Sequence, residues 1–199
     1  MAGRDPADKS MSFFVTSYGI ARDGMSAPGV KGQGNLGGLV GADAHCQKLA
    51  AAVGSKFTWR AYLSTSAENA ADRIGQGPWY NANGSLVGMD LAALHTTNGL
   101  AGRVGDAAVF GVTEDKQAYA RPQHDVITGS NEDGTVATGF TCMDWTSNSD
   151  ADRAMVGHLD GMGGNRPGIN GWNSEHENSG CHEEGISTPG SGLFYCFAL

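Results

Sequence analysis

The feature that most constrains the fold is the set of four cysteines, Cys46, Cys142, Cys181 and Cys196. They are widely spaced and contain no C-x-x-C pair, which argues against a zinc ribbon or a thioredoxin-type site. An even number of separated cysteines in a chain with 31 glycines among 199 residues is typical of disulfides that staple a loop-rich domain. The pattern predicts two disulfides and a secreted or cell-envelope location. The spacing alone leaves three pairings open.

The charge of the chain is concentrated in one stretch. Residues 121–184 carry 11 acidic and 3 basic residues, which accounts for the whole net charge of −8. Nucleic acid and heparin-like polyanions are therefore excluded as expected partners, because such ligands are bound by clustered Lys and Arg. No apolar run is long enough to span a membrane. Cations and neutral sugars remain as possible ligands.

Local patterns predict a single α+β domain over residues 11–199, with a mostly antiparallel sheet, one or two helices and long loops. Residues 1–10, MAGRDPADKS, are interpreted as a tag or a processed N-terminal remnant. A short helix is expected within residues 89–97, capped by Asp90. The expected strands are residues 11–17, 58–66, 107–113, 124–130 and 192–199.

The clearest predicted helix covers residues 41–54. Cys46, Leu49, Ala50 and Val53 fall at i, i+3, i+4 and i+7, which forms one apolar stripe. Asp43 is the expected N-cap, and Gly54 is expected just past the C-terminal end. A cysteine on the buried stripe favours a disulfide partner in a core strand.

Three blocks of the sequence together suggest a family. They are GADAHCQKLAAAVGSKFTWRAYLSTS, TGSNEDGTVATGFTCMDWT and the terminal FYCFAL. Their order resembles the endostatin-like branch of the C-type-lectin-like fold, whose bacterial members are often called lectins. The resemblance implies nested disulfides, Cys46–Cys196 and Cys142–Cys181. It also implies an extracellular binding module for a glycan or a cell-surface protein, and calcium as a cofactor, as in the sugar-binding members of the fold.

The acidic loop GWNSEHENSGCHEE, residues 171–184, has two interpretations. Asn173, Glu175, Glu177 and Asn178 supply the oxygen ligands that calcium prefers, with Asp160 or Asp144 completing the shell. Trp172-Asn173-Ser174 also resembles the Trp-Asn-Asp segment of sugar-binding C-type lectins, although their Glu-Pro-Asn segment is absent. The alternative is a solvated loop that is pinned by the disulfide at Cys181.

A second kind of metal site would use histidine with carboxylate. Imidazole and carboxylate together suit zinc, and the carboxylate can also orient a ligating ring. This hypothesis describes a metal-dependent enzyme or a metal-binding protein, and no pair shows the H-E-x-x-H helical spacing. His124 could instead cap the turn before the strand at residues 124–130. The candidate ligands are His124, Asp125, His158, Asp160, Glu175 and His176.

Aromatic and amide side chains offer a platform for a sugar. Trp79, Tyr80 and Asn81 lie in the turn-rich segment GPWYNANG, and Trp172 lies in the acidic loop. Rings of this kind stack on a pyranose face while amides bind hydroxyl groups. The alternative is that the tryptophans belong to the core. No G-x-S-x-G motif is present, so no catalytic residue is predicted. An ion-free adhesion domain is the third hypothesis.

Overall fold

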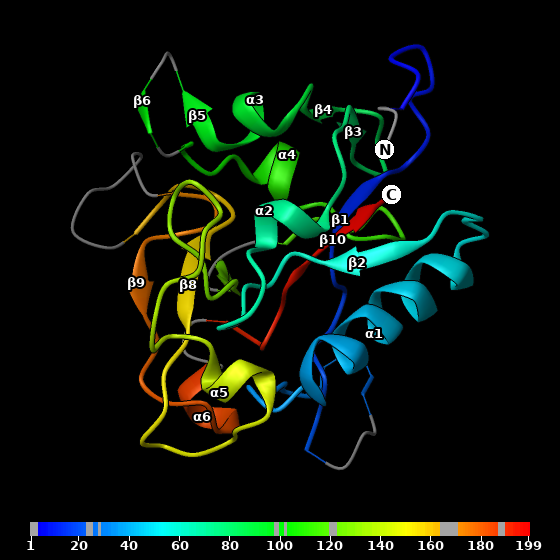
Figure 1. The fold of residues 1–199 in the computed structure, drawn as a ribbon. Coiled ribbons are helices and arrows are strands. Elements are labelled where there is room, and N and C mark those ends of the chain that lie inside the picture. Colours follow the sequence, from blue (N-terminus) through cyan, green and yellow to red (C-terminus); the bar gives the residue numbers. More distant parts are fainter. Residues whose placement is uncertain are drawn as a thin grey trace.

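The last strand of the chain lies in the middle of a three-stranded antiparallel sheet. β10 (Tyr195–Ala198) pairs with β1 (Phe13–Val15) and with β2 (Trp59–Ala61), in the order β1-β10-β2. Figure 1 shows this sheet crossing the centre of the molecule, with α1 (Gly38–Ala52) lying along β2. The computed structural model describes residues 4–22, 26–27, 29–97, 100–101, 103–119, 123–163, 171–186 and 190–199.

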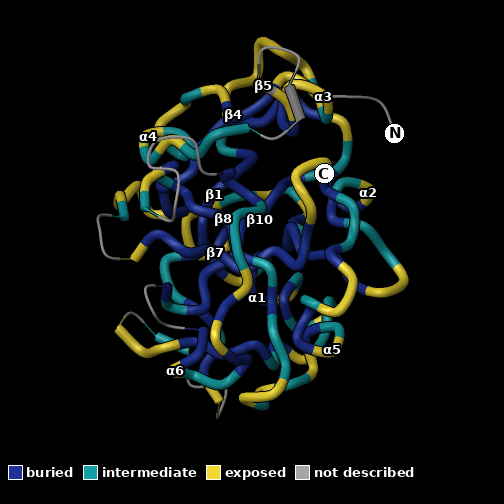
Figure 2. The backbone as a smooth tube through the Cα atoms, turned by 90° about the vertical axis from the view of Figure 1, so that its left-hand side faces the viewer, coloured by how far each residue is buried: buried dark blue, intermediate teal, exposed yellow. Residues whose placement is uncertain are grey.

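The two faces of this sheet bury two different clusters. Successive side chains of a strand point to opposite faces. Phe14 and Cys196 accordingly face the cluster under α1, whereas Phe13, Tyr195 and Phe197 face the other cluster. All four residues of β10 are buried, as expected for a strand covered on both sides. Figure 2 shows a mostly buried, dark blue interior surrounded by exposed segments of the chain.

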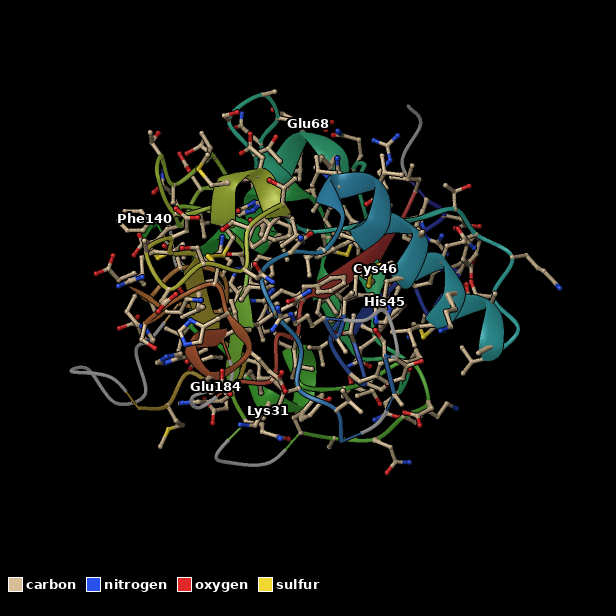
Figure 3. All side chains as sticks on the ribbon, turned by 90° about the horizontal axis from the view of Figure 1, so that it is seen from below. Lys31, His45, Cys46, Glu68, Phe140 and Glu184 are labelled. Carbon is tan, nitrogen blue, oxygen red and sulfur yellow. A yellow bond between two sulfur atoms is a disulfide. The ribbon has the colours of Figure 1, made fainter. Side chains whose placement is uncertain are left out.

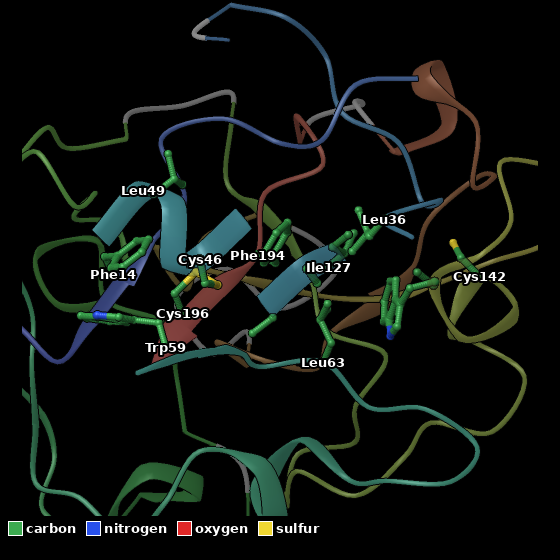
Figure 4. Packing of buried hydrophobic residues seen from close by; sticks show 14 of the residues in the cluster. Phe14, Leu36, Cys46, Leu49, Trp59, Leu63, Ile127, Cys142, Phe194 and Cys196 are labelled. Atoms are coloured by element: carbon green, nitrogen blue, oxygen red, sulfur yellow. A yellow bond between two sulfur atoms is a disulfide. The ribbon is translucent and has the colours of Figure 1, made fainter. Parts of the chain in front are cut away.

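The helix α1 packs through a buried stripe against the first cluster. Cys46, Leu49 and Ala50 are buried there, as the apolar spacing predicts. Leu49 and Cys46 lie beside Phe14, Trp59 and the strand β10 (Figure 4). In Figure 3, Cys46 and the neighbouring His45 are labelled on α1.

Both disulfides that the family resemblance implies are present. Cys46 of α1 is bonded to Cys196 of β10, and Cys142 is bonded to Cys181. The first bridge spans a sequence separation of 150 residues and encloses the second, which spans 39. In the chain-entropy account, closing the larger loop stabilises the fold by about 5 kcal/mol. Two disulfides are consistent with an extracellular protein.

The other described elements are short and are joined by loops. None of the described helices is both long enough and apolar enough to cross a membrane. The small sheets pair β3 with β4, β5 with β6, β7 with β8, and β8 with β9, all antiparallel. The elements are α2 (Ala70–Arg73), β3 (Trp79–Tyr80), β4 (Leu86–Gly88), α3 (Leu91–His95), β5 (Thr96–Thr97), β6 (Leu100–Ala101), α4 (Ala107–Phe110), β7 (Asp125–Ile127), α5 (Cys142–Trp145), β8 (Met155–His158), β9 (His176–Glu177) and α6 (Glu183–Ile186).

The turn α5 has the opposite hand to an ordinary helix. Its four residues have φ angles of 48°, 53°, 55° and 66°, all in the left-handed region although none is glycine. Such a conformation costs roughly 1–2 kcal/mol per residue. The turn is held by the disulfide at Cys142 and by Trp145, which is fully buried and donates its indole N–H to the Ser64 carbonyl at 2.8 Å.

Most of the predicted elements are present, with three corrections. α1 begins at Gly38, so Asp43 lies inside the helix, where its carboxylate accepts hydrogen bonds from Arg73 instead of capping. Val53 follows the helix and is 44% exposed, so it is not part of the buried stripe. Residues 107–113 were expected as a strand, but a helix forms because the Asp106 carboxylate caps its start, accepting from the Ala108 N–H at 2.9 Å.

Candidate metal centre

The register of the sheet β7-β8-β9 brings three of the predicted ligands to one face. Asp125 of β7 is directly opposite His158 of β8, and His176 of β9 is opposite Val156, two residues before His158. Directly paired residues and residues two apart along a strand share a face. Asp125, His158 and His176 therefore project to the same side. β8 and β9 lie side by side on the left of Figure 1.

His124 reaches this face from the residue just before β7. Its ring stacks on His158, with centroids 4.4 Å apart and an interplanar angle of 20°. The stack places His124 Nε2 3.5 Å from Asp125 Oδ1, and His158 Nε2 3.2 Å from the same oxygen. His176 Nε2 lies 2.9 Å from His158 Nε2 and 3.9 Å from Asp125 Oδ2.

Two of the rings are oriented by acceptors outside the cluster. His124 Nδ1 is 3.0 Å from the Asp160 carboxylate, and His176 Nδ1 is 2.9 Å from the Glu177 carbonyl. A carbonyl or carboxylate oxygen accepts only from an N–H, so each Nδ1 carries the proton. In the neutral form of each ring, Nε2 then presents a lone pair to the cluster. This arrangement is the usual one for histidines that ligate metals.

The Asp125 carboxylate is the unusual member of the cluster. Its side chain is 4% exposed, yet Oδ1 receives no hydrogen bond from any described residue. His158 Nε2 lies 3.2 Å from this oxygen but does not donate a hydrogen bond to it. A buried anionic oxygen surrounded by imidazole nitrogens calls for a positive charge between them.

The distances fit the edges of a coordination polyhedron. Zinc bonds of about 2.0–2.1 Å in tetrahedral geometry give ligand–ligand separations of about 3.3–3.4 Å. In His124, Asp125 and His158 one ligand atom from each residue lies within 4.8 Å of the others, and this buried group could hold a metal ion. Among the described residues it is the only such group of three or more His, Cys, Asp or Glu side chains.

The other predicted metal ligands lie outside this group. Asp160 is the hydrogen-bond acceptor of His124, and the Glu175 carboxylate accepts from the Gly171 N–H at 3.2 Å. Glu177 follows His176 on β9 and so faces the opposite side of the strand. Asn173 is fully buried and donates its amide to Tyr62 Oη and to the carbonyls of the 131–135 loop. Calcium binding by Asn173, Glu175 and Glu177 stays a prediction.

The residues of the expected sugar platform are buried, as the alternative of core tryptophans predicts. Trp79 and Trp172 have no exposed area, Asn81 has none, and Tyr80 is 6% exposed. Trp79 packs edge-on against Phe197 at 5.3 Å, and Trp172 stacks on Phe110 at 4.8 Å. Turn-forming neighbours led to the expectation that Trp79 points outward. The ring instead fills the second core cluster, whose burial of apolar area outweighs the local turn signal.

Two of the three histidines outside the cluster make structural hydrogen bonds. His45 Nε2 is 3.0 Å from the Tyr18 carbonyl, and His95 Nε2 is 2.7 Å from Tyr62 Oη. Burial lowers the pKa of both rings, because the charged form is desolvated. Burial also raises the pKa of Tyr62, so its hydroxyl stays protonated and donates to His95.

Two supporting features of the centre were not predicted from the sequence. A Cβ atom at Gly163 would lie 2.7 Å from His124 Cε1, so this glycine allows the imidazole its position. The Glu177 carbonyl fixes the proton on His176. A backbone carbonyl has no signal in the sequence, and Gly163 is one of many glycines.

The sequence was also compared with known proteins. No model of a known protein family matches the chain, and no curated protein is significantly similar to it. The resemblance to endostatin-like proteins therefore remains an expectation, and the structure itself shows an α+β fold, two disulfides and a His/Asp group able to hold a metal ion.

Proposed function

We propose that the protein is a disulfide-stapled metal-binding domain whose centre takes a divalent transition-metal ion, zinc before others. The ligands are His124 Nε2, His158 Nε2 and Asp125 Oδ1. One observation carries the proposal, which is the buried Asp125 oxygen without a donor beside imidazole nitrogens. A cation between these atoms would remove the cost of the unpaired carboxylate oxygen.

The donor set favours zinc over calcium. Calcium takes six to eight oxygen ligands, whereas this group offers one carboxylate and two imidazoles. Zinc takes nitrogen and carboxylate oxygen in tetrahedral sites, and copper competes for the same ligands because it binds more tightly to most nitrogen sites. The Asp160 carboxylate behind His124 is the kind of outer partner that raises the basicity of a ligating ring.

Glycan recognition, another of the three hypotheses from the sequence, has less support. Its stacking residues are buried in the core, so a sugar would have to use a surface that no observation singles out among the described residues. Metal binding is therefore the function that the geometry supports best.

The test is metal titration of the full chain prepared without a histidine tag and stripped with a chelator. We expect one zinc ion per chain by calorimetry and elemental analysis. At a free zinc concentration one hundred times Kd, the free energy of unfolding rises by about 2.7 kcal/mol. For a chain of this size that raises Tm by roughly 5–10 °C. Calcium at the same concentration should leave Tm unchanged.

Two variants make the titration specific. His124→Ala removes a ligand, and His182→Ala removes an imidazole from the same acidic third outside the cluster. We expect zinc binding to be lost in the first and retained in the second, with circular dichroism confirming that both are folded. Absence of stoichiometric zinc in the parent protein, or equal binding by His124→Ala, would overturn the proposal.

A further inference from the structure

Resting on the proposed function, we infer that His176 is a fourth, exchangeable ligand that closes over the ion from the solvent side. The ion then enters and leaves the centre at His176. When this ring is removed, its position accepts a small imidazole from solution. The inference concerns the exchange of the metal and not only its presence.

Burial separates His176 from the other three groups. The side chains of His158, Asp125 and His124 are 1%, 4% and 10% exposed, whereas His176 is 41% exposed. The three covered groups present their ligand atoms from the protein side. Among the four groups, His176 is the one with a largely exposed side chain, so the path of the ion to water passes this ring.

The backbone restrains His158 and Asp125 more strongly than His176. His158 lies on β8, the middle strand of β7-β8-β9, and Asp125 is paired directly with it. His176 lies on β9, a two-residue strand at the edge of the sheet that pairs with β8 alone. A short edge strand with an exposed side chain is the part of the centre that can move with the least loss of packing.

The ring of His176 is nevertheless aimed at the centre. Its Nδ1–H donates to the Glu177 carbonyl, so its Nε2 accepts a 2.9 Å hydrogen bond from His158 Nε2–H in the metal-free chain, and an ion bound at His158 Nε2 would take the place of that proton. His176 stands outside the tight group in which all ligand atoms lie within 4.8 Å of one another. The three inner groups are therefore preassembled, and His176 needs a side-chain rotation toward the ion to complete a four-coordinate site.

The experiment uses Co²⁺ as the probe, because its visible absorption reports the number and type of its ligands. His176→Ala and the control His182→Ala are compared with the parent chain for Co²⁺ affinity, absorption spectrum and rate of release to a chelator. Each sample is then titrated with imidazole. His124→Ala serves as the variant that loses an inner ligand.

We expect His176→Ala to keep binding Co²⁺, but at least ~10-fold more weakly, since even loss of an outer-shell partner costs ~10–100-fold. Release should be faster and the spectrum altered, and imidazole should restore the parent spectrum in this variant alone. The control should match the parent chain throughout.

Three outcomes overturn the inference. If His176→Ala matches the parent in affinity and spectrum while His124→Ala loses the metal, His176 is not a ligand and the proposed function stands. If imidazole changes the parent spectrum as strongly as that of His176→Ala, the fourth position is already open and His176 does not close it. If the parent chain binds neither Co²⁺ nor Zn²⁺, the proposed function fails together with this inference.

Discussion

The substitution Asp125→Asn distinguishes a metal centre from a cluster of charged histidines. The side chain keeps its shape but loses its negative charge. In the metal-free protein the Asp125 Oδ1 atom is buried and has no hydrogen-bond donor. A buried polar group left unsatisfied costs about 1–3 kcal/mol. The amide of asparagine carries no charge and gives the imidazole lone pairs a donor.

We therefore expect Asp125→Asn to stabilise the metal-free protein by about 1–2 kcal/mol, a part of that unsatisfied-group cost. At roughly 2–4 °C for each kcal/mol in a chain of this size, Tm rises by about 2–8 °C. In the presence of zinc the parent becomes the more stable of the two proteins, because the variant lacks an anionic ligand. The parent gains about 2.7 kcal/mol at one hundred times Kd, and the variant gains far less.

The assay is thermal and urea unfolding of both proteins, with chelator and with zinc. The metal centre is supported if Asp125→Asn is more stable than the parent in chelator and less stable than the parent in zinc. Protonated imidazoles would instead make Asp125 one member of a buried ion pair, and breaking such a pair costs about 3–5 kcal/mol. A strongly destabilised Asp125→Asn protein in chelator would therefore refute the reasoning.

Four further predictions concern other parts of the fold. Arg73→Met should lower the free energy of unfolding in urea by about 3 kcal/mol, since the buried guanidinium pairs with two carboxylates that stay partly exposed; no loss would contradict the ion pairing. Burial lowers the pKa of His95 in the folded state, so its contribution to stability is complete above about pH 6.5 and is lost as pH falls. The free energy of unfolding of His95→Gln should thus fall less steeply between pH 7 and 5 than that of the parent. An equal fall in both proteins would exclude His95 as the cause. Gly163→Ala should displace His124 and weaken zinc binding ~10–100-fold while the circular dichroism spectrum is kept; unchanged affinity would contradict the close approach. Met143→Gly, at an exposed left-handed residue, should raise the unfolding free energy by about 1 kcal/mol, and a loss would refute the strain.

Much of the framework follows from local sequence patterns. The stripe of Cys46, Leu49 and Ala50 predicts the buried face of α1, and Asp90 predicts the start of α3, where its carboxylate accepts from the Ala93 N–H at 2.8 Å. These features depend on residues a few positions apart. The pairing of the cysteines needed the family resemblance, since spacing does not decide among three pairings.

The centre itself was predictable only as a set of residue types. Histidines and carboxylates in the acidic third suggested a transition metal, but several combinations were equally open. Which of them meet depends on the register of β7-β8-β9, where a shift of one residue would turn His176 to the other face. The stacking of His124 on His158 is likewise a tertiary contact with no local signal.

Of two other features, one has a local signal and the other depends on the whole fold. A run of four apolar residues such as 107–110 suits a strand or a helix equally, and the Asp106 cap decides. The left-handed turn at Cys142–Trp145 contains no glycine that would announce it, because packing around Trp145 imposes the conformation.

The nesting of the two bridges has a mechanical consequence. Tension applied to the two ends of the chain passes from α1 to β10 through the Cys46–Cys196 bond, bypassing the residues between them. Only the segments outside this bridge, residues 1–45 and 197–199, can lengthen under load. Asp125, His158 and His176 all lie between Cys46 and Cys196. Pulling on an anchored molecule would therefore leave the arrangement of these side chains unchanged.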